Sequence, residues 1–123
     1  MAITLTNQTP VDLDHIIDLH EKTHWIVNFQ SADATGNEII RADPGAGAQL
    51  ILSWILINYP FADTVVLNED TTAILGPFTM TATSPPLVLD FRDAPYPLAF
   101  NTALQIDTGG GNIITGVAVG FTV

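Results

Sequence analysis

The stretch that decides the fold is IITGVAVGFTV, residues Ile113–Val123. Its larger apolar residues, Val117, Val119 and Phe121, recur at every second position, and this period of two predicts a β-strand with one apolar face. The opposite face carries a row of small groups: Gly116, Ala118 and Gly120. Such a row would let another backbone or sheet approach the strand closely.

The residues before this stretch repeat the same alternation. Leu98, Phe100, Leu104 and Ile106 recur at alternate positions of the run 98–106, with Thr102 at the remaining one, and this predicts another strand. Gly109–Asn112 lies between the two runs and is rich in residues that accept positive φ. Two alternating runs around a glycine-rich connection predict a β-hairpin that ends the chain.

Short apolar runs separated by turn residues about every ten positions continue towards the N-terminus. The run at 49–57 is almost wholly apolar and reads as a strand or a short helix; its length and the Asn-Tyr-Pro that follows favour a central strand. Further strands are expected at Trp25–Gln30, Thr64–Leu67, Phe78–Met80 and Leu87–Phe91. The pattern predicts an all-β fold with little helix: a single antiparallel β-sandwich domain over residues 1–123, either jelly-roll-like or Ig-like.

The composition restricts the partners that the chain can bind. Of its 123 residues, 47% are hydrophobic and 13% are charged, which suggests that a partner covers part of the surface. The net charge is −10, with Lys22, Arg41 and Arg92 the 3 cations, so neither nucleic acid nor an anionic membrane is an expected partner. The sequence contains no cysteine, and we expect neither a signal peptide nor a membrane-spanning segment.

His20-Glu21-Lys22-Thr23-His24 spells H-E-x-x-H, the pattern of zinc hydrolases. On a helix opening at Thr9-Pro10, His20 and His24 would share one face, and Glu21 would act as the general base. No histidine follows His24 to complete the ligand set, and the β-branched and aromatic run after it favours a strand. We therefore interpret the motif as a polar turn with both histidines at its rim. They are metal candidates only if the segment is helical, and no cofactor is expected.

Other candidate sites are weaker. Asp12, Asp14 and Asp18 lack the loop of a calcium site, and Asp90 with Asp93 has no sign of a glycosidase cleft. Gly109-Gly110-Gly111 lacks the Lys-Ser/Thr of a phosphate-binding loop. Four aromatic residues could form a platform on which sugars stack: Trp25, Trp54, Tyr59 and Tyr96. The alternative for the two tryptophans is that they belong to the core.

The order of features resembles small β-sandwich structural proteins of tailed bacteriophage virions, namely capsid decoration (cement) and head or tail accessory proteins. The stretches that carry the resemblance are Ile3–Thr6, Trp25–Ser31, Ala42–Gly47, Thr72–Phe78 and the glycine-rich final pair of strands. The resemblance implies a β-sandwich without catalytic residues that often assembles as a homotrimer. It also implies that the partners are the major capsid protein and sister subunits, that the chain is made in the host cytoplasm, and that it ends on the outer capsid surface.

Three functions follow from the sequence. The leading hypothesis is a non-enzymatic virion structural protein that decorates and stabilises a phage head. The second is a carbohydrate- or receptor-binding module on a tail or fibre, and the third is the H-E-x-x-H zinc hydrolase.

Overall fold

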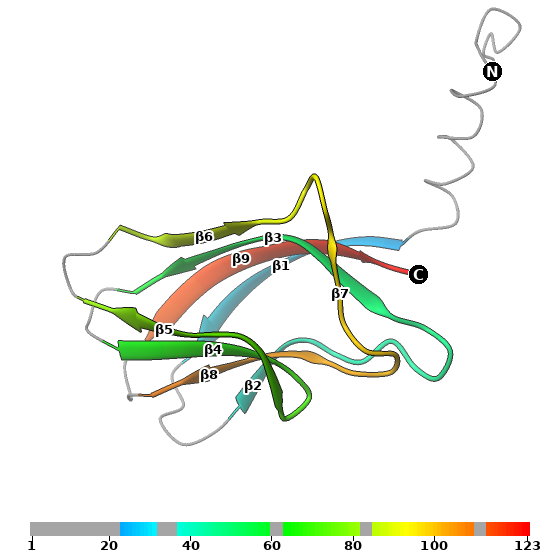
Figure 1. Ribbon diagram of the computed structural model, residues 1–123, viewed down its shortest axis with the longest axis horizontal. Helices are drawn as coiled ribbons and strands as arrows, with labels where there is room; N and C mark the ends of the chain where they lie inside the picture. Colours follow the sequence, from blue (N-terminus) through cyan, green and yellow to red (C-terminus); the bar gives the residue numbers. More distant parts are fainter. Residues whose placement is uncertain (1–22, 32–36, 60–62, 82–84, 110–112) are drawn as a thin grey trace, which may run out of the picture.

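The computed structural model describes residues 23–31, 37–59, 63–81, 85–109 and 113–123, and these form nine β-strands and no helix (Figure 1). The strands are β1 (Thr23–Ser31), β2 (Asn37–Arg41), β3 (Leu50–Asn58), β4 (Asp63–Glu69), β5 (Thr72–Met80), β6 (Leu87–Asp90), β7 (Tyr96–Pro97), β8 (Leu104–Thr108) and β9 (Ile114–Thr122). The prediction of an antiparallel β-sandwich is confirmed.

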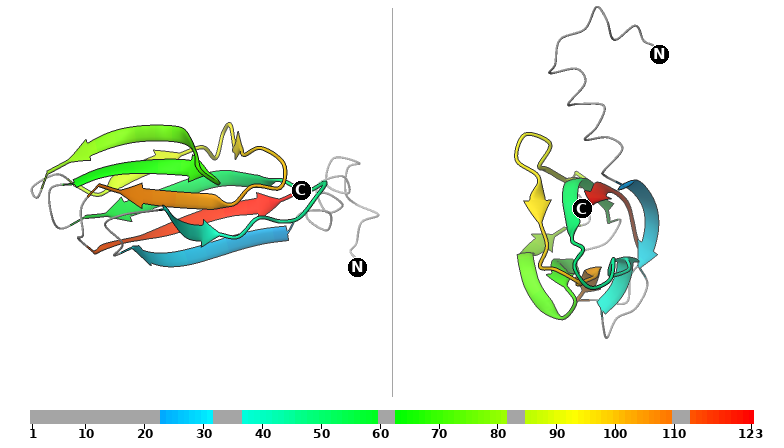
Figure 2. Two further views of the ribbon diagram at one scale, coloured as in Figure 1. Left: turned by 90° about the horizontal axis from the view of Figure 1, so that it is seen from below. Right: turned by 90° about the vertical axis from the view of Figure 1, so that its right-hand side faces the viewer.

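The strands form two packed sheets (Figure 2). Sheet A has the order β1-β9-β3-β6, with the short β7 also paired to β3, and sheet B has the order β2-β8-β4-β5. All pairings are antiparallel. Apart from β7 the pairs are nested along the chain, β1 with β9, β2 with β8, β3 with β6 and β4 with β5.

Nested pairing of eight strands is the connectivity of a hairpin ribbon rolled into two four-stranded sheets, which is a jelly roll. An Ig-like sandwich divides seven or nine strands differently between its sheets. The strand order therefore decides between the two sandwich types that the sequence left open.

The prediction of a final β-hairpin is wrong. β8 pairs with β2 and β4 in sheet B, whereas β9 pairs with β1 and β3 in sheet A. The chain therefore crosses from one sheet to the other between them. Alternation with a period of two indicates only that one face of each strand is buried. The same alternation is expected whether the two strands are neighbours in one sheet or lie in opposite sheets.

Two strand boundaries also differ from the expectation. The strand expected over Leu98–Ile106 begins only at Leu104, because a turn with Asn101 at φ 56° precedes it. The strand expected at Phe78–Met80 starts earlier, at Thr72, and runs through the cis Gly76-Pro77 bond. Proline is compatible with this strand because β5 is an edge of sheet B, where one side of the backbone has no ladder partner.

The row of small residues on β9 faces the interior. Gly116, Ala118 and Gly120 are buried, and the rings of Phe29 and Trp25 lie against the two glycines. A Cβ added at either glycine would overlap a β1 ring and a carbonyl oxygen of β3. The close approach expected from the small groups is therefore the approach of β1 and β3 to β9. The most deeply buried part of the remaining core is aliphatic, with Leu52, Ile55, Ile57, Val65, Leu67 and Leu104 all 0% exposed.

Where β1 and β2 approach each other from opposite sheets, a cation lies over an aromatic ring. The Arg41 guanidinium carbon lies 5.7 Å from the centre of the Trp25 ring. Trp25 itself is 5% exposed, and the prediction that it belongs to the core is confirmed.

Candidate functional site

The histidine motif falls at the boundary of the described structure. Thr23 and His24 are the first two residues of β1, so this half of the motif is strand. His24 is exposed and its ring lies 5.8 Å from the ring of Phe121 on β9. His20, with Glu21 and Lys22, lies outside the described residues, as do Asp12, Asp14 and Asp18. Within the part of the chain that is described, no group of three metal-ligating side chains gathers.

Three of the remaining candidate residues, Asp90, Asp93 and Gly109, lie within the described part of the chain. Asp90 forms an ion pair with Arg92, with 2.6 Å between Oδ2 and Nη2. The hydrogen bonds from Arg92 lower the pKa of Asp90 to about 2, so this carboxylate is ionised at neutral pH and is unsuited to the role of a general acid. Gly109 follows β8 and makes a backbone bond to the Thr64 carbonyl, while the two glycines after it are outside the described residues.

The four aromatic residues do not form one platform. Trp25 and Tyr59 are each 5% exposed, and the Tyr59 hydroxyl donates to the carbonyl oxygen of Pro85. Tyr96 packs against Phe91, with 5.7 Å between the ring centres. Trp54 is half-buried. It pairs with Val119, which points away from the core, so Trp54 lies on the outer face of sheet A. The expectation that both tryptophans belong to the core is therefore wrong for Trp54.

Trp54 lies on an apolar surface that covers the middle of the outside of sheet A. The residues Ile26, Val119 and Trp54 are directly opposite one another on β1, β9 and β3. Val117, Leu56 and Val88 form the next row, on β9, β3 and β6. We call this surface the apolar outer face; it consists of Ile26, Trp54, Leu56, Val88, Val117, Val119 and Phe121.

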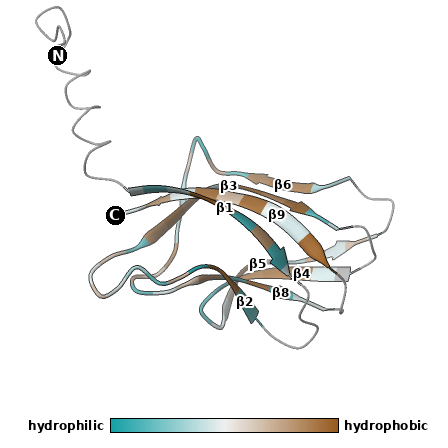
Figure 3. Ribbon diagram, turned by 180° about the vertical axis from the view of Figure 1, so that it is seen from behind, coloured by the Kyte–Doolittle hydropathy of each residue, from teal (hydrophilic) through white to brown (hydrophobic). Residues whose placement is uncertain are grey.

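The apolar outer face is partly open to solvent. Ile26 is 72% exposed and Val88 is 47% exposed, and the other members are half-buried against each other. Figure 3 shows the hydrophobic colour along β3 and β9. Contiguous apolar surface of this kind on a folded domain marks a site of association more often than scattered single residues do.

Charge is nearly absent from this sheet. Across the described strands β1, β3, β6, β7 and β9, Asp90 at the end of β6 is the sole aspartate, glutamate, lysine or arginine. Sheet B is different, because its outer face carries Gln105 and Asp107, with Asn37 opposite Asp107. The two outer faces of the sandwich therefore differ in polarity, and sheet A is the side suited to an apolar partner.

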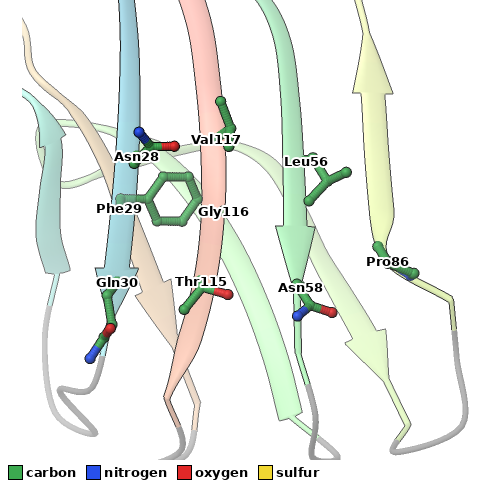
Figure 4. Close-up of a pocket in the computed structure, with 9 residues that line it drawn as sticks. All are labelled: Asn28, Phe29, Gln30, Leu56, Asn58, Pro86, Thr115, Gly116 and Val117. Carbon is green, nitrogen blue, oxygen red and sulfur yellow. The ribbon is translucent and has the colours of Figure 1, made fainter.

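The apolar outer face ends in a hollow lined by amides (Figure 4). Gln30, Thr115 and Asn58 form one row across β1, β9 and β3, with Asn28 in the row above. The hollow has a volume of about 690 Å³, and its other lining residues are Phe29, Leu56, Pro86, Gly116 and Val117. Its polar groups are neutral donors and acceptors, which is the chemistry that binds uncharged hydroxyl groups.

Sequence reasoning did not find the apolar outer face or the hollow. The signal was present in β9, whose inward residues are too small to form a core layer by themselves, so its larger residues had to face the other way. Recognising this needs the knowledge that Trp25 and Phe29 fill the space above the glycines.

Comparisons with known proteins are sparse. No protein-family model matches the chain, and no curated protein matches it. Among solved structures, it is similar to a chain of the virus-like particle of extra small virus (XSV) from the giant freshwater prawn Macrobrachium rosenbergii. The identity is 14%, the TM-score is 0.49, and the match covers 82% of this chain and 77% of that one. Because this similarity is low, we assign the jelly roll from the strand pairing of the chain itself. The resemblance to tailed-phage proteins stays a prediction.

The described residues contain no helix long and apolar enough to cross a membrane.

Proposed function

We propose that this chain is a non-enzymatic structural subunit of a virus particle. The observation that carries the proposal is the apolar outer face of sheet A, which is uncharged except for Asp90 at its margin. An apolar face of this kind is stabilised when a partner covers it, at about 25 cal/mol per Å² of apolar area removed from water. Jelly rolls occur in viral capsid proteins, lectins and cupins, and this fold-level analogy supports the first class.

The finer proposal is that the chain decorates the outside of a capsid and cements it. The partners would be the major capsid protein and sister subunits. A net charge of −10 with 3 cations is unfavourable for a subunit that lines a shell against packaged nucleic acid. The same charge favours docking on a basic outer patch and keeps free subunits soluble. Charge thus supports the decoration role, while the fold and the apolar outer face support the capsid role.

The test compares particles that have the chain with particles that lack it. The chain should sediment with the particles, and particles without it should release their genome at a lower temperature. Val119→Asp places a charge in the middle of the apolar outer face and should abolish binding. Ile39→Asp is the matched control, since Ile39 is 62% exposed on the outer side of sheet B. The decoration role is lost if the wild-type chain stays in the soluble fraction, or if both variants bind as it does.

The hollow supports a second candidate, a carbohydrate-binding module on a tail or fibre. The amides of Asn28, Gln30 and Asn58, the Thr115 hydroxyl and the absence of charge among the lining residues suit a neutral sugar. A glycan array followed by Asn58→Ala distinguishes this function. We expect a hit that the substitution weakens and that Gln105→Ala, on sheet B, leaves unchanged. An array without a hit would refute it.

A further inference from the structure

The four edges of the sandwich differ in how well they are protected against pairing with another strand. β2 has 5 residues and a register shift, and it carries Glu38 and Arg41. β5 contains Pro77 and faces register shifts in its pairing with β4, and β6 has only 4 residues. Short length, proline, charge and bulges are the devices that stop sheet edges from recruiting other strands.

β1 has none of these devices. It runs for 9 residues, THWIVNFQS, with no proline, lysine, arginine, aspartate or glutamate. Its register with β9 is unbroken from Thr23 to Ser31. The side of β1 that faces away from β9 therefore presents a long, uninterrupted row of backbone donors and acceptors. Such an edge is a template for β-strand addition.

We propose that β1 pairs antiparallel with β1 of a second copy of this chain. Two identical strands that meet at the same edge pair residues of equal parity, because alternate residues direct their backbone groups to that edge. The register with the greatest overlap places Val27 opposite the partner's Val27. Ile26 is then opposite the partner's Asn28, and Trp25 is opposite the partner's Phe29.

In this register several residues of β1 lie opposite a residue of the same chemical type in the partner. Trp25 lies directly opposite the partner's Phe29, so an aromatic residue stands at the same level on both strands, while each ring stays packed on a glycine of β9. The hydroxyl residues at the two ends of the strand, Thr23 and Ser31, also meet. The Ser31 hydroxyl is buried and has no hydrogen-bond partner within the described structure, and the partner's Thr23 would supply one.

Charge opposes self-association of this chain least at this edge. Two chains that each carry −10 repel one another, so self-association is least costly where no acidic side chain lies opposite another. β1 has no acidic residue, and neither does its neighbour β9. Pairing would also extend sheet A across the axis and cover part of Ile26, the most exposed of the large apolar residues described, at 72%. The isologous pairing predicts a two-fold dimer.

Cysteine mapping tests the register directly, because the chain has no cysteine of its own. Residues directly opposite each other have Cα atoms about 4.5–5.5 Å apart, within the range of a disulfide, whereas diagonal neighbours are about 7–8 Å apart. Under mild oxidation, a mixture of Ile26→Cys and Asn28→Cys chains should form the mixed disulfide faster than either variant forms a disulfide with itself. If each variant crosslinks as fast alone as in the mixture, the register is wrong.

Analytical ultracentrifugation tests the dimer. At about 100 µM, where a complex with a Kd of about 1 µM is nearly saturated, the wild-type chain should sediment as a dimer. Ile26→Lys places two lysines near each other across the axis and should give a monomer. Ile39→Lys, at a comparably exposed isoleucine of sheet B, should remain dimeric. A wild-type monomer, a trimer or an Ile26→Lys dimer would each overturn the proposal.

The dimer does not depend on the proposed virion function. A chain that dimerises through β1 but never associates with particles would refute the virion function alone. A chain that binds particles as a monomer would refute the β1 pairing alone.

Discussion

Gly120→Ala is the substitution that tests the packing of the sandwich most sharply. Gly120 lies on the inner face of β9, between β1 and β3. An added Cβ would overlap the Ile51 carbonyl oxygen on one side and the six-membered ring of Trp25 on the other. Ala118, two residues earlier on the same face, is 0% exposed and already carries a Cβ, so the restriction is local.

The loss of stability caused by Gly120→Ala depends on whether the atoms that the new Cβ overlaps can move away. Overpacking a core by one methyl group costs about 1–3 kcal/mol. One of the two overlaps is with backbone, which cannot rotate away, so we expect the upper end, about 3 kcal/mol. For a domain of this size about 1 kcal/mol lowers the Tm by roughly 4 °C, so the Tm should fall by roughly 12 °C.

Circular dichroism melting and urea denaturation would measure the loss in free energy of unfolding. Val119→Ala, the adjacent outward position, is the control and should cost less than about 1 kcal/mol. Trp25→Phe removes the ring atoms that the new Cβ meets, so Gly120→Ala should cost about 1 kcal/mol less in that background. If Gly120→Ala keeps the Tm within about 2 °C of wild type, then Trp25 and β3 do not enclose β9 as described.

Three other predictions concern the core, one ion pair and the histidine motif. Ile55→Ala, at a position 0% exposed, should lower the free energy of unfolding in urea by about 2–5 kcal/mol. NMR titration should give Asp90 a pKa of about 2, and Arg92→Ala should return it towards 3.8. Because the folded-state pKa is depressed, any stabilisation by this pair is complete above about pH 4 and is lost as the pH falls towards 2. Protein purified without chelators should contain less than stoichiometric zinc by metal analysis, and His24→Ala should not change that content; one zinc per chain would contradict it.

The strands themselves could be predicted from sequence because alternation and turn residues are local signals. The expected central strand at 49–57 is β3, which lies between β9 and β6. The strand expected at 25–30 is contained in β1. Their partners could not be predicted in the same way. β8 and β9 are close in sequence but lie in different sheets, and their alternation is the same in either arrangement.

The orientation of β9 required knowledge of residues almost a hundred positions away. The pattern of Val117, Val119 and Phe121 suggests an apolar face, but it does not say whether that face is inside. Large rings on β1 decide the matter, because Trp25 and Phe29 occupy the space that larger inward side chains on β9 would need. The amide hollow was missed for a related reason, since its polar row is assembled from three strands that are distant in sequence.

The same eleven residues therefore determine both the fold and the surface available to a partner. Because the interior accepts only small groups from β9, the valines and phenylalanine of this strand face outward with Trp54 and Leu56 of β3. Folding of one copy leaves these groups half-buried, so part of the hydrophobic free energy of the strand is released only when a second surface covers it. A second surface can cover these groups in two ways, by pairing with the open edge at β1 or by docking on the outer face of sheet A. The edge fits a second copy of the chain, and the face then remains free for a different protein.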